Sequence, residues 1–195
     1  MNLFAKQDDR LVKGCKANNR QAQEGLYKLF YAEILKLCYR YLKSDDLAME
    51  ALNAGFLKVF QNIDTYEREK GELGAWIRSI MVRTCIDLAR KEAKFNEIGE
   101  SRDDSEFIFI TPDVLDKLYA EDVLKAIRTL PAATQLVFNL SVIEGYSHKE
   151  IGDQLQITES TSRWHLSEAK KQLRATLQPI HKSINEPTEN KRKSK

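Results

Sequence analysis

Apolar residues recur along this chain at spacings of three and four rather than two, which is the period of amphipathic helices. Proline and glycine are scarce, at 4 and 8 of 195 residues, so few segments are interrupted. Together with a short helix around residues 9–17, the pattern predicts a bundle of about four helices within residues 1–95. Its apolar faces are Ala22, Leu26, Leu29, Phe30, Leu37 and Tyr41, then Ala48, Leu52, Gly55, Phe56, Val59 and Ile63, then Leu73, Ile77, Ile80, Thr84 and Leu88.

The helical pattern stops near residue 96 and resumes at Leu118. The stretch between them has no sustained period, and residues 97–116 hold seven acidic side chains and one basic side chain. We therefore expect residues 96–117 to form a flexible acidic linker. Its one apolar patch, residues 107–110, is more typical of a segment that docks on a neighbouring surface than of a strand.

A second set of apolar positions predicts another small helical domain over residues 118–180. Beyond Pro179 the chain becomes polar and basic, so residues 181–195 are expected to be a disordered tail. The predicted fold class is therefore all-α, with two small helical domains joined by the linker. The apolar positions of the second domain are Leu118, Val123, Ile127, Leu130, Leu136, Val137, Leu140, Ile151, Leu155, Leu166, Leu173 and Leu177.

Part of this second domain has the signature of a helix-turn-helix. Ser147 and Glu150 have the spacing of a capping box, in which each side chain bonds the backbone N–H of the other residue. The box begins a first helix over residues 147–154, and the pair Gln156-Ile157 makes the break. A second helix then follows over residues 160–177. Its cap is Thr158 or Ser160, and its buried stripe is Leu166, Ala169, Leu173 and Leu177.

The outer face of residues 160–177 carries the side chains that could read DNA. Two helices joined in this way can place the second one in the major groove. The same pattern fits a solvated amphipathic helix that binds no nucleic acid. Trp164 favours a partner, either DNA or a packed neighbouring domain, because a large aromatic residue turned away from its own core exposes apolar surface. A helical wheel puts Ser160, Trp164, Ser167, Glu168 and Lys171 opposite the stripe, Arg163, Lys170 and Arg174 on one flank, and His165 on the other.

The composition excludes several other classes of protein. The 3 cysteines are odd in number and widely spaced, so we expect reduced core thiols rather than disulfides or metal ligands. The 3 histidines lack a metal-binding context, and the chain shows no nucleophile–base pair or phosphate-binding loop. We therefore expect no enzyme activity, no metal, no cofactor and no small-molecule substrate. Without a signal peptide or about 18 consecutive apolar residues, a cytoplasmic protein with no direct membrane insertion is expected.

Several motifs together resemble the bacterial sigma factors. Residues 130–131, 137–140, 144–151 and 158–163 are similar to region four of the sigma-70 family, in its compact extracytoplasmic-function (ECF) group. Residues 39–42, 56–60, 74–77 and 86–90 are similar to region two of the same family. The two resemblances occur in the family's order on either side of the linker. Two ordered regions are far more specific than a lone helix-turn-helix.

The resemblance implies a transcription initiation factor that works as a subunit of RNA polymerase. Region two would bind the clamp helices of core RNA polymerase and would read and melt the minus-ten promoter element. Region four would read the minus-thirty-five element. The implied partners are core RNA polymerase and promoter DNA, with an anti-sigma factor as a further partner that family members commonly have. The acidic linker would thread the RNA exit path, although a solvated tether explains its composition equally well.

Carrying the family's roles onto this sequence gives three sets of candidate residues. The minus-thirty-five set is Ser160, Thr161, Ser162, Arg163, Trp164, His165, Ser167, Lys170 and Lys171. The minus-ten set is Tyr66, Arg68, Lys70, Arg83, Arg90, Lys91 and Lys94. The core-binding set is Asp46, Glu50, Asn53 and Phe56.

Two of these assignments have an equally physical alternative. Tyr66 is the only aromatic residue in the polar loop between Ile63 and Gly74, and it could stack on a base extruded from the non-template strand or could cover the bundle. The helical cations suit a phosphate backbone. Asp87 lies among them and could instead pair with Arg83, Arg90 or Lys91 along a solvated helix. We expect Trp76 to belong to the bundle core.

The sequence also departs from the family pattern. Asn53 and Ala54 stand where Gln and an acidic residue are usual on the polymerase-facing helix, and Arg83 stands where Asn is common. Gln156 stands where the turn usually has Gly, at a cost of about 1 kcal/mol if the residue needs a positive φ. Trp164 and Glu168 replace smaller or basic residues, so we infer an unusual promoter sequence.

Two other functions remain possible at this point. A stand-alone helix-turn-helix regulator would bind an operator tightly without polymerase, and would more often be a symmetric dimer. A diverged relative that only sequesters a protein partner would bind no DNA, so a strong salt dependence of DNA affinity would argue against it.

Overall fold

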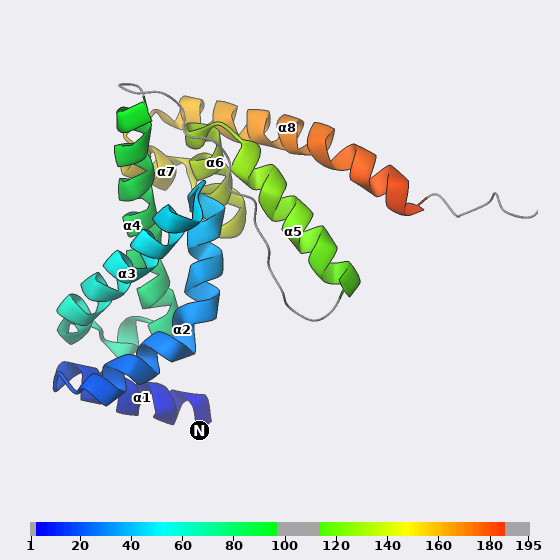
Figure 1. Cartoon of the computed structure of the whole chain (residues 1–195). Helices are drawn as coiled ribbons and strands as arrows, with labels where there is room; N and C mark the ends of the chain where they lie inside the picture. Colours follow the sequence, from blue (N-terminus) through cyan, green and yellow to red (C-terminus); the bar gives the residue numbers. More distant parts are fainter. Residues whose placement is uncertain (1–2, 97–113, 186–195) are drawn as a thin grey trace, which may run out of the picture. The chain divides into compact units, whose positions relative to one another are not determined.

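The computed structural model describes the backbone of residues 3–96 and 114–185, and the side chains of residues 8–92 and 121–177. Within these ranges all the regular structure is helical, which confirms the predicted all-α class (Figure 1). The chain divides into two compact units, one holding α1 to α4 and the other α5 to α8. The part of the chain described contains no helix with the length and apolar character of a membrane span.

Polar caps start the long helices of the first unit. The Asn19 side chain accepts a hydrogen bond from the Ala22 N–H (3.1 Å), and the Ser44 hydroxyl accepts one from the Leu47 N–H (3.2 Å). Each cap satisfies a backbone donor that the helix itself cannot. The unit comprises α1 (Leu3–Lys16), α2 (Arg20–Tyr41), α3 (Asp45–Asn62), η1 (Ile63–Thr65), η2 (Arg68–Lys70) and α4 (Leu73–Asn96).

The core of this unit lies between α2, α3 and α4, which pack against one another, with α1 packed on α2 and η1. Gly55 permits the close approach of α3 and α4, because a Cβ there would lie 2.1 Å from the Met81 sulfur. The three predicted apolar faces are largely confirmed. Leu29 is an exception at 47% exposure, because it falls at the margin of the α2 stripe. Fully buried side chains include Leu26, Ile34, Leu37, Tyr41, Leu52, Phe56, Leu73, Ile77 and Met81.

All the cysteines lie in the first unit. Cys15, Cys38 and Cys85 are buried free thiols, as predicted, and the sulfurs of Cys38 and Cys85 are 3.8 Å apart. Burial raises the pKa of the Cys15 thiol. A buried thiol of this kind behaves as a small apolar side chain, so the cysteines contribute packing to the bundle.

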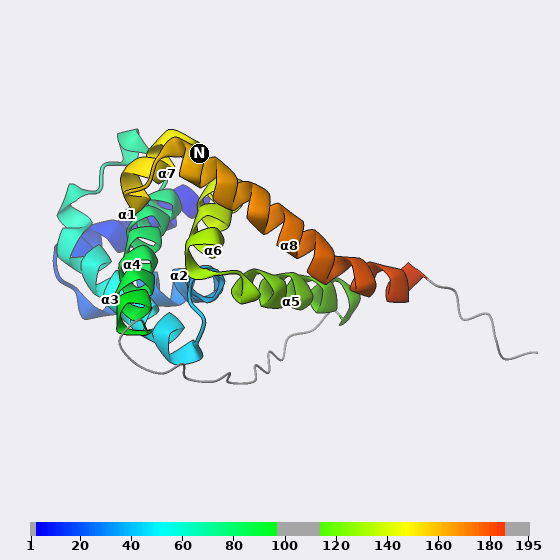
Figure 2. The same cartoon turned by 90° about the horizontal axis from the view of Figure 1, so that it is seen from above.

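The second unit is a smaller helical domain in which α8 is the longest element (Figure 2). Its core includes Ala126 and Ile127 of α5 and Leu130, which directly follows α5, packed against Ala169 and Leu173 of α8. The helices α6 and α7 also pack on α8 and supply further buried residues. The elements are α5 (Val114–Thr129), α6 (Ala132–Phe138), η3 (Asn139–Ile143, one turn of π-helix), α7 (His148–Leu155) and α8 (Glu159–Asn185).

Several helix ends differ from the predictions. The first helix begins at Leu3 rather than near residue 9, and α5 begins at Val114 rather than Leu118. Asp116, predicted to be in the linker, lies in the first turn of α5, where a negative charge is favourable. The last helix continues through Pro179 to Asn185, so residues 181–185 are helical rather than part of a disordered tail. The rest of the predicted linker and tail lies outside the described residues.

Candidate nucleic-acid interface

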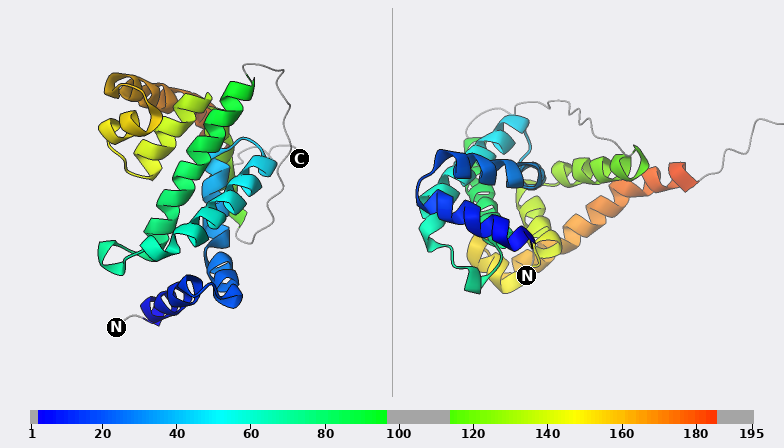
Figure 3. Two further views of the ribbon diagram at one scale, coloured as in Figure 1. Left: turned by 90° about the vertical axis from the view of Figure 1, so that its left-hand side faces the viewer. Right: turned by 90° about the horizontal axis from the view of Figure 1, so that it is seen from below.

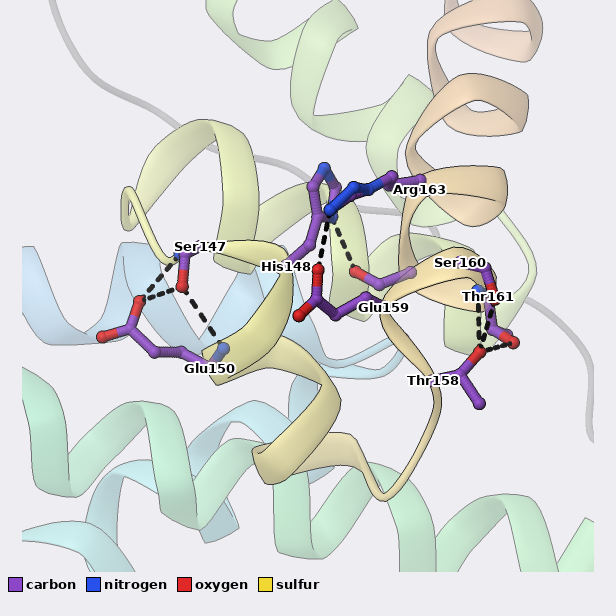
Figure 4. Close-up of polar contacts among 9 residues, drawn as sticks. Ser147, His148, Glu150, Thr158, Glu159, Ser160, Thr161 and Arg163 are labelled. Carbon is purple, nitrogen blue, oxygen red and sulfur yellow. Dashed lines mark hydrogen bonds and ion pairs between the residues drawn. The ribbon is translucent and has the colours of Figure 1, made fainter.

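A reciprocal capping box starts α7, as predicted (Figure 4). The Ser147 hydroxyl oxygen accepts from the Glu150 N–H (3.3 Å), and a carboxylate oxygen of Glu150 accepts from the Ser147 N–H (2.8 Å) and hydroxyl (2.7 Å). These hydrogen bonds from Ser147 lower the pKa of Glu150. The first helix of the helix-turn-helix is therefore capped by its own side chains.

The turn after α7 depends on the backbone conformation of Gln156 and on the absence of a side chain at Gly152. Gln156 adopts the left-handed conformation (φ 57°, ψ 44°), which confirms the expected need for a positive φ. Its side-chain amide donates to the Asp153 carbonyl (2.7 Å). Gly152 allows the backbone at Ile157 to come close to α7, because a Cβ at position 152 would lie 2.8 Å from the Ile157 carbonyl oxygen. This glycine was not singled out from the sequence.

The first turn of α8 is held by side-chain hydroxyls. Of the two predicted caps it is Thr158 that fills the role, since its hydroxyl oxygen accepts from the Thr161 N–H (3.1 Å). The same hydroxyl bonds those of Ser160 and Thr161, each at 2.8 Å (Figure 4). Arg163 forms an ion pair with Glu159 (2.7 Å), and both side chains are about half exposed. An exposed pair contributes only about 0–1 kcal/mol, so the guanidinium can exchange this partner for a phosphate at little cost.

Two polar pairs, each joining a buried hydroxyl to a half-buried histidine, tie α8 to α6 and α7. The Ser162 hydroxyl bonds the His148 ring Nδ1 (2.9 Å) and is fully buried, so this side chain does not lie on the DNA-facing surface where it was predicted. The Thr134 hydroxyl bonds the His165 ring Nδ1 (3.0 Å). Burial lowers the pKa of His165, because the protonated ring is poorly solvated there. Both pairs fix the orientation of α8, because a buried hydroxyl is costly to leave unbonded.

The remaining predicted residues form the exposed face of α8. Trp164 is 61% exposed, and its ring meets the His165 ring edge-on with centroids 4.9 Å apart. Glu168 is half-buried and accepts a hydrogen bond from the Gln172 amide (2.8 Å), which moderates its repulsion of phosphate. Thr161 is half-buried. The exposed members of the predicted set are Ser160, Arg163, Trp164, Ser167, Lys170 and Lys171.

In the first unit, Tyr66 covers the bundle rather than projecting from it. Its ring lies 5.5 Å from the half-buried Trp76 ring, and its hydroxyl donates to the Gly71 carbonyl (3.1 Å). Burial is the main cause that raises the pKa of Tyr66. Beside the two rings is a cleft of about 260 Å³, lined by Thr65, Tyr66, Glu67, Lys70, Gly71, Glu72, Ala75 and Trp76.

The cations of this loop are paired with acids. Arg68 forms an ion pair with Asp9 of α1, and Lys70 pairs with Glu67 (2.9 Å). All four side chains are at least half exposed. The pairs are therefore weak enough to open when a polyanion approaches.

On α4 the predicted cations face solvent to different degrees. Arg83 and Lys91 are exposed, Arg90 is half-buried, and the side chain of Lys94 lies outside the described residues. Asp87 pairs with Lys58 of α3 (3.6 Å) rather than with a base of its own helix. The ion-pair partner of Asp87 therefore comes from a neighbouring helix, whereas the spacing of charges along α4 had suggested a partner on α4 itself.

The predicted polymerase-facing residues split between the surface and the core. Asp46, Glu50 and Asn53 are exposed along one stripe of α3. Phe56 is 2% exposed and stacks on Tyr27 with ring centroids 4.6 Å apart, so it belongs to the core and not to the contact surface. The stripe continues instead at Leu57, which is 58% exposed and which the sequence analysis missed. The spacing of four, three and four from Asp46 to Leu57 could have revealed it.

Comparison with known proteins places both units in one family. The family Sigma-70 region 2 matches residues 26–95, and Sigma-70, region 4 matches residues 120–173. The chain is 25% identical to the RNA polymerase sigma factor SigV of Bacillus subtilis over 145 residues, covering 74% of this chain and 84% of SigV. It is 23% identical over 184 residues to the ECF RNA polymerase sigma factor SigW of the same organism, covering 87% and 96% of the two chains.

Two solved structures share the fold. The sigma factor RpoE of Bartonella quintana, solved with the anti-sigma factor NepR, matches with a TM-score of 0.56 at 19% identity, covering 80% of this chain and 96% of that one. CnrH, solved with the cytosolic domain of CnrY, matches with a TM-score of 0.50 at 16% identity, covering 89% and 98%. Since both regions match in order and the relatives align over most of their length, the chain belongs to the ECF group of the sigma-70 family, transcription initiation factors that direct RNA polymerase to promoters.

Proposed function

We propose that the two units divide promoter recognition, with α8 reading the minus-thirty-five element and the α1–α4 unit reading and melting the minus-ten element. We assign region two to residues 1–95 and region four to residues from 114 onward. The observation that carries the proposal is the exposed face of α8, whose orientation is fixed by the part-buried His148–Ser162 and Thr134–His165 pairs. A reading helix needs such support, because base contacts require positions accurate to a fraction of an ångström.

On the reading face, cations and an apolar ring have separate tasks. Arg163, Lys170 and Lys171 supply positive charge for phosphates or for guanine edges. Trp164 supplies an apolar surface that suits a thymine methyl group. Its 61% exposure leaves roughly 100 Å² of apolar surface to be covered, which is worth about 2 kcal/mol or roughly thirtyfold in affinity.

Footprinting of the holoenzyme tests this face directly. Trp164→Ala should weaken protection of the minus-thirty-five element by roughly thirtyfold while circular dichroism stays unchanged. Val142→Ala is the matched control, because Val142 is also a large apolar side chain, 50% exposed in the same unit but on η3. Equal protection by the wild type and Trp164→Ala would show that α8 does not read the promoter through this face.

For core RNA polymerase we propose the α3 stripe of Asp46, Glu50, Asn53 and Leu57. An exposed leucine flanked by acids and an amide is the composition of an interface with a small apolar centre and a polar rim. Leu57→Asp should abolish most binding to core, whereas Leu29→Asp should not, since Leu29 is 47% exposed but lies on α2. Co-purification with core measures both. Equal retention of the two variants would assign the contact elsewhere.

The proposed partners also include an anti-sigma factor, because both similar structures were solved with another protein and one of these is named an anti-sigma factor. We infer a cytoplasmic location, where core polymerase and DNA are found, and no catalytic activity of the subunit itself. A stand-alone regulator would bind its site equally well with and without core, so gel shifts under both conditions separate the two functions.

A further inference from the structure

The loop that joins α3 to α4 buries little of its own surface, although the Tyr66–Gly71 hydrogen bond and the Lys70–Glu67 ion pair lie within it. Between residues 63 and 72, only Ile63 and Tyr66 are buried. Its backbone bonds are those of its two short 3-10 turns, such as Tyr66 N–H to Ile63 carbonyl (3.2 Å) and Gly71 N–H to Arg68 carbonyl (3.2 Å). A segment with so little burial takes its shape from whatever packs against it.

The helix α1 is the element that holds this loop from outside. The Lys16 ammonium donates to the carbonyls of Asp64 (3.3 Å) and Tyr66 (3.2 Å), on either side of Thr65. At the other end of the loop, Asp9 of α1 pairs with Arg68. Figures 1 and 3 show α1 crossing the end of the bundle at which α3 meets α4.

The position of α1 is itself fixed. Val12 and Cys15 are 9% and 4% exposed, and α1 packs on α2 as well as on η1. Lys16 lies in the last turn of α1, where a positive charge is favourable. The Lys16 ammonium therefore links α1 to the backbone of Tyr66, whose ring forms a wall of the cleft beside Trp76.

We propose that α1 sets the shape of residues 63–72, which we call the minus-ten loop, with Lys16 as the positioning residue. This rests on the proposed minus-ten role of the unit. Because the carbonyls of Asp64 and Tyr66 share one ammonium, the Asp64–Thr65 and Tyr66–Glu67 peptide groups are held in one orientation. Tyr66 and the cleft beside Trp76 are held with them, so an extruded base meets a preformed wall. This α1 lies before residues 26–95, the part that matches Sigma-70 region 2.

Promoter opening by the holoenzyme tests the role of Lys16. The probe is a promoter selected from a random duplex library by the wild-type holoenzyme, with a fluorescent adenine analogue in the non-template strand of its minus-ten element. Lys16→Met keeps the apolar stem and removes the donors, and it should slow opening by about three- to tenfold. Lys16→Arg should restore most of the rate. Lys13→Met is the control, since Lys13 is also exposed and lies in the same last turn of α1, three residues before Lys16.

Four further readouts separate positioning from other roles. Hydrogen exchange in residues 63–72 should rise in Lys16→Met and not in Lys13→Met, while the melting temperature of the unit and its core binding stay the same. The salt dependence of closed-complex affinity should also stay unchanged. A reduced salt slope would mean that Lys16 contacts phosphate, and a fall in melting temperature that Lys16→Arg does not restore would mean a structural role. Either result overturns the proposal.

The same experiment separates the positioning role of Lys16 from the minus-ten role of the α1–α4 unit. If the wild-type holoenzyme opens the promoter and Lys16→Met opens it at the rate of Lys13→Met, the positioning role is wrong and the minus-ten assignment stands. If the wild-type holoenzyme binds the promoter without opening it, the minus-ten assignment itself fails.

Discussion

Replacing Gly152 by alanine should destabilise the helix-turn-helix, although alanine is the better helix former. In a helix free of clashes, glycine to alanine stabilises by about 0.5–1 kcal/mol. At this position, however, the new Cβ would lie 2.8 Å from the Ile157 carbonyl oxygen, so the turn must open by a few tenths of an ångström. Overpacking of this kind costs about 1–3 kcal/mol, which leaves a net loss of about 1–2 kcal/mol.

Thermal unfolding measures this loss. For a unit of this size, about 1–2 kcal/mol corresponds to a melting temperature lower by roughly 5–15 °C. Hydrogen exchange within α7 and α8 assigns the change to the second unit, and Lys149→Ala, an exposed change in the same helix, should stay within about 0.5 kcal/mol. A higher melting temperature for Gly152→Ala would refute the reasoning, because it would mean that the turn relaxes without cost.

Three further predictions concern single side chains. Gln156→Gly should stabilise the second unit by up to about 1 kcal/mol, because glycine adopts the left-handed conformation found there (φ 57°) without strain. A lower melting temperature would show that losing the hydrogen bond to Asp153 costs more than the relieved strain gains. Asp9→Asn should remove one negative charge beside Arg68 and tighten promoter binding by about two- to fivefold at low salt. Equal affinities at low salt would contradict this. Burial lowers the pKa of His165 from 6.5, so the unfolded chain takes up a proton at a higher pH than the folded chain does. The melting temperature should therefore fall as the pH drops below 6.5, and His165→Gln should make that fall smaller.

The buried faces of the helices were predictable because burial imposes a period on the sequence. Phe56 illustrates this well. The apolar pattern placed it on the inner face of α3, where it is found at 2% exposure, and only the family resemblance moved it to the polymerase-facing set. Its neighbour Leu57 is 58% exposed and was not singled out, although the spacing of the polar stripe of α3 leads directly to that position.

Contacts between helices were not predictable in the same way. A helical wheel divides one helix into inner and outer faces, but it does not say which neighbour lies against the margin. The family resemblance assigned Ser162 to the DNA-reading set, yet its side chain is buried and its hydroxyl bonds His148 of α7. Asp87 similarly pairs with Lys58 of α3, a partner that no spacing along α4 could reveal. The hold of Lys16 on the loop after α3 joins residues about 50 positions apart and was equally invisible.

The central claim is that this chain directs polymerase to promoters rather than acting on DNA alone. Runoff transcription tests it most directly, with core RNA polymerase of the source organism and the promoter selected from the random library. The chain with core should give one discrete transcript, Leu57→Asp and Trp164→Ala should each reduce it strongly, and core alone should give none. Tight, specific binding to the same DNA without core, together with no transcript when core is present, would contradict the claim.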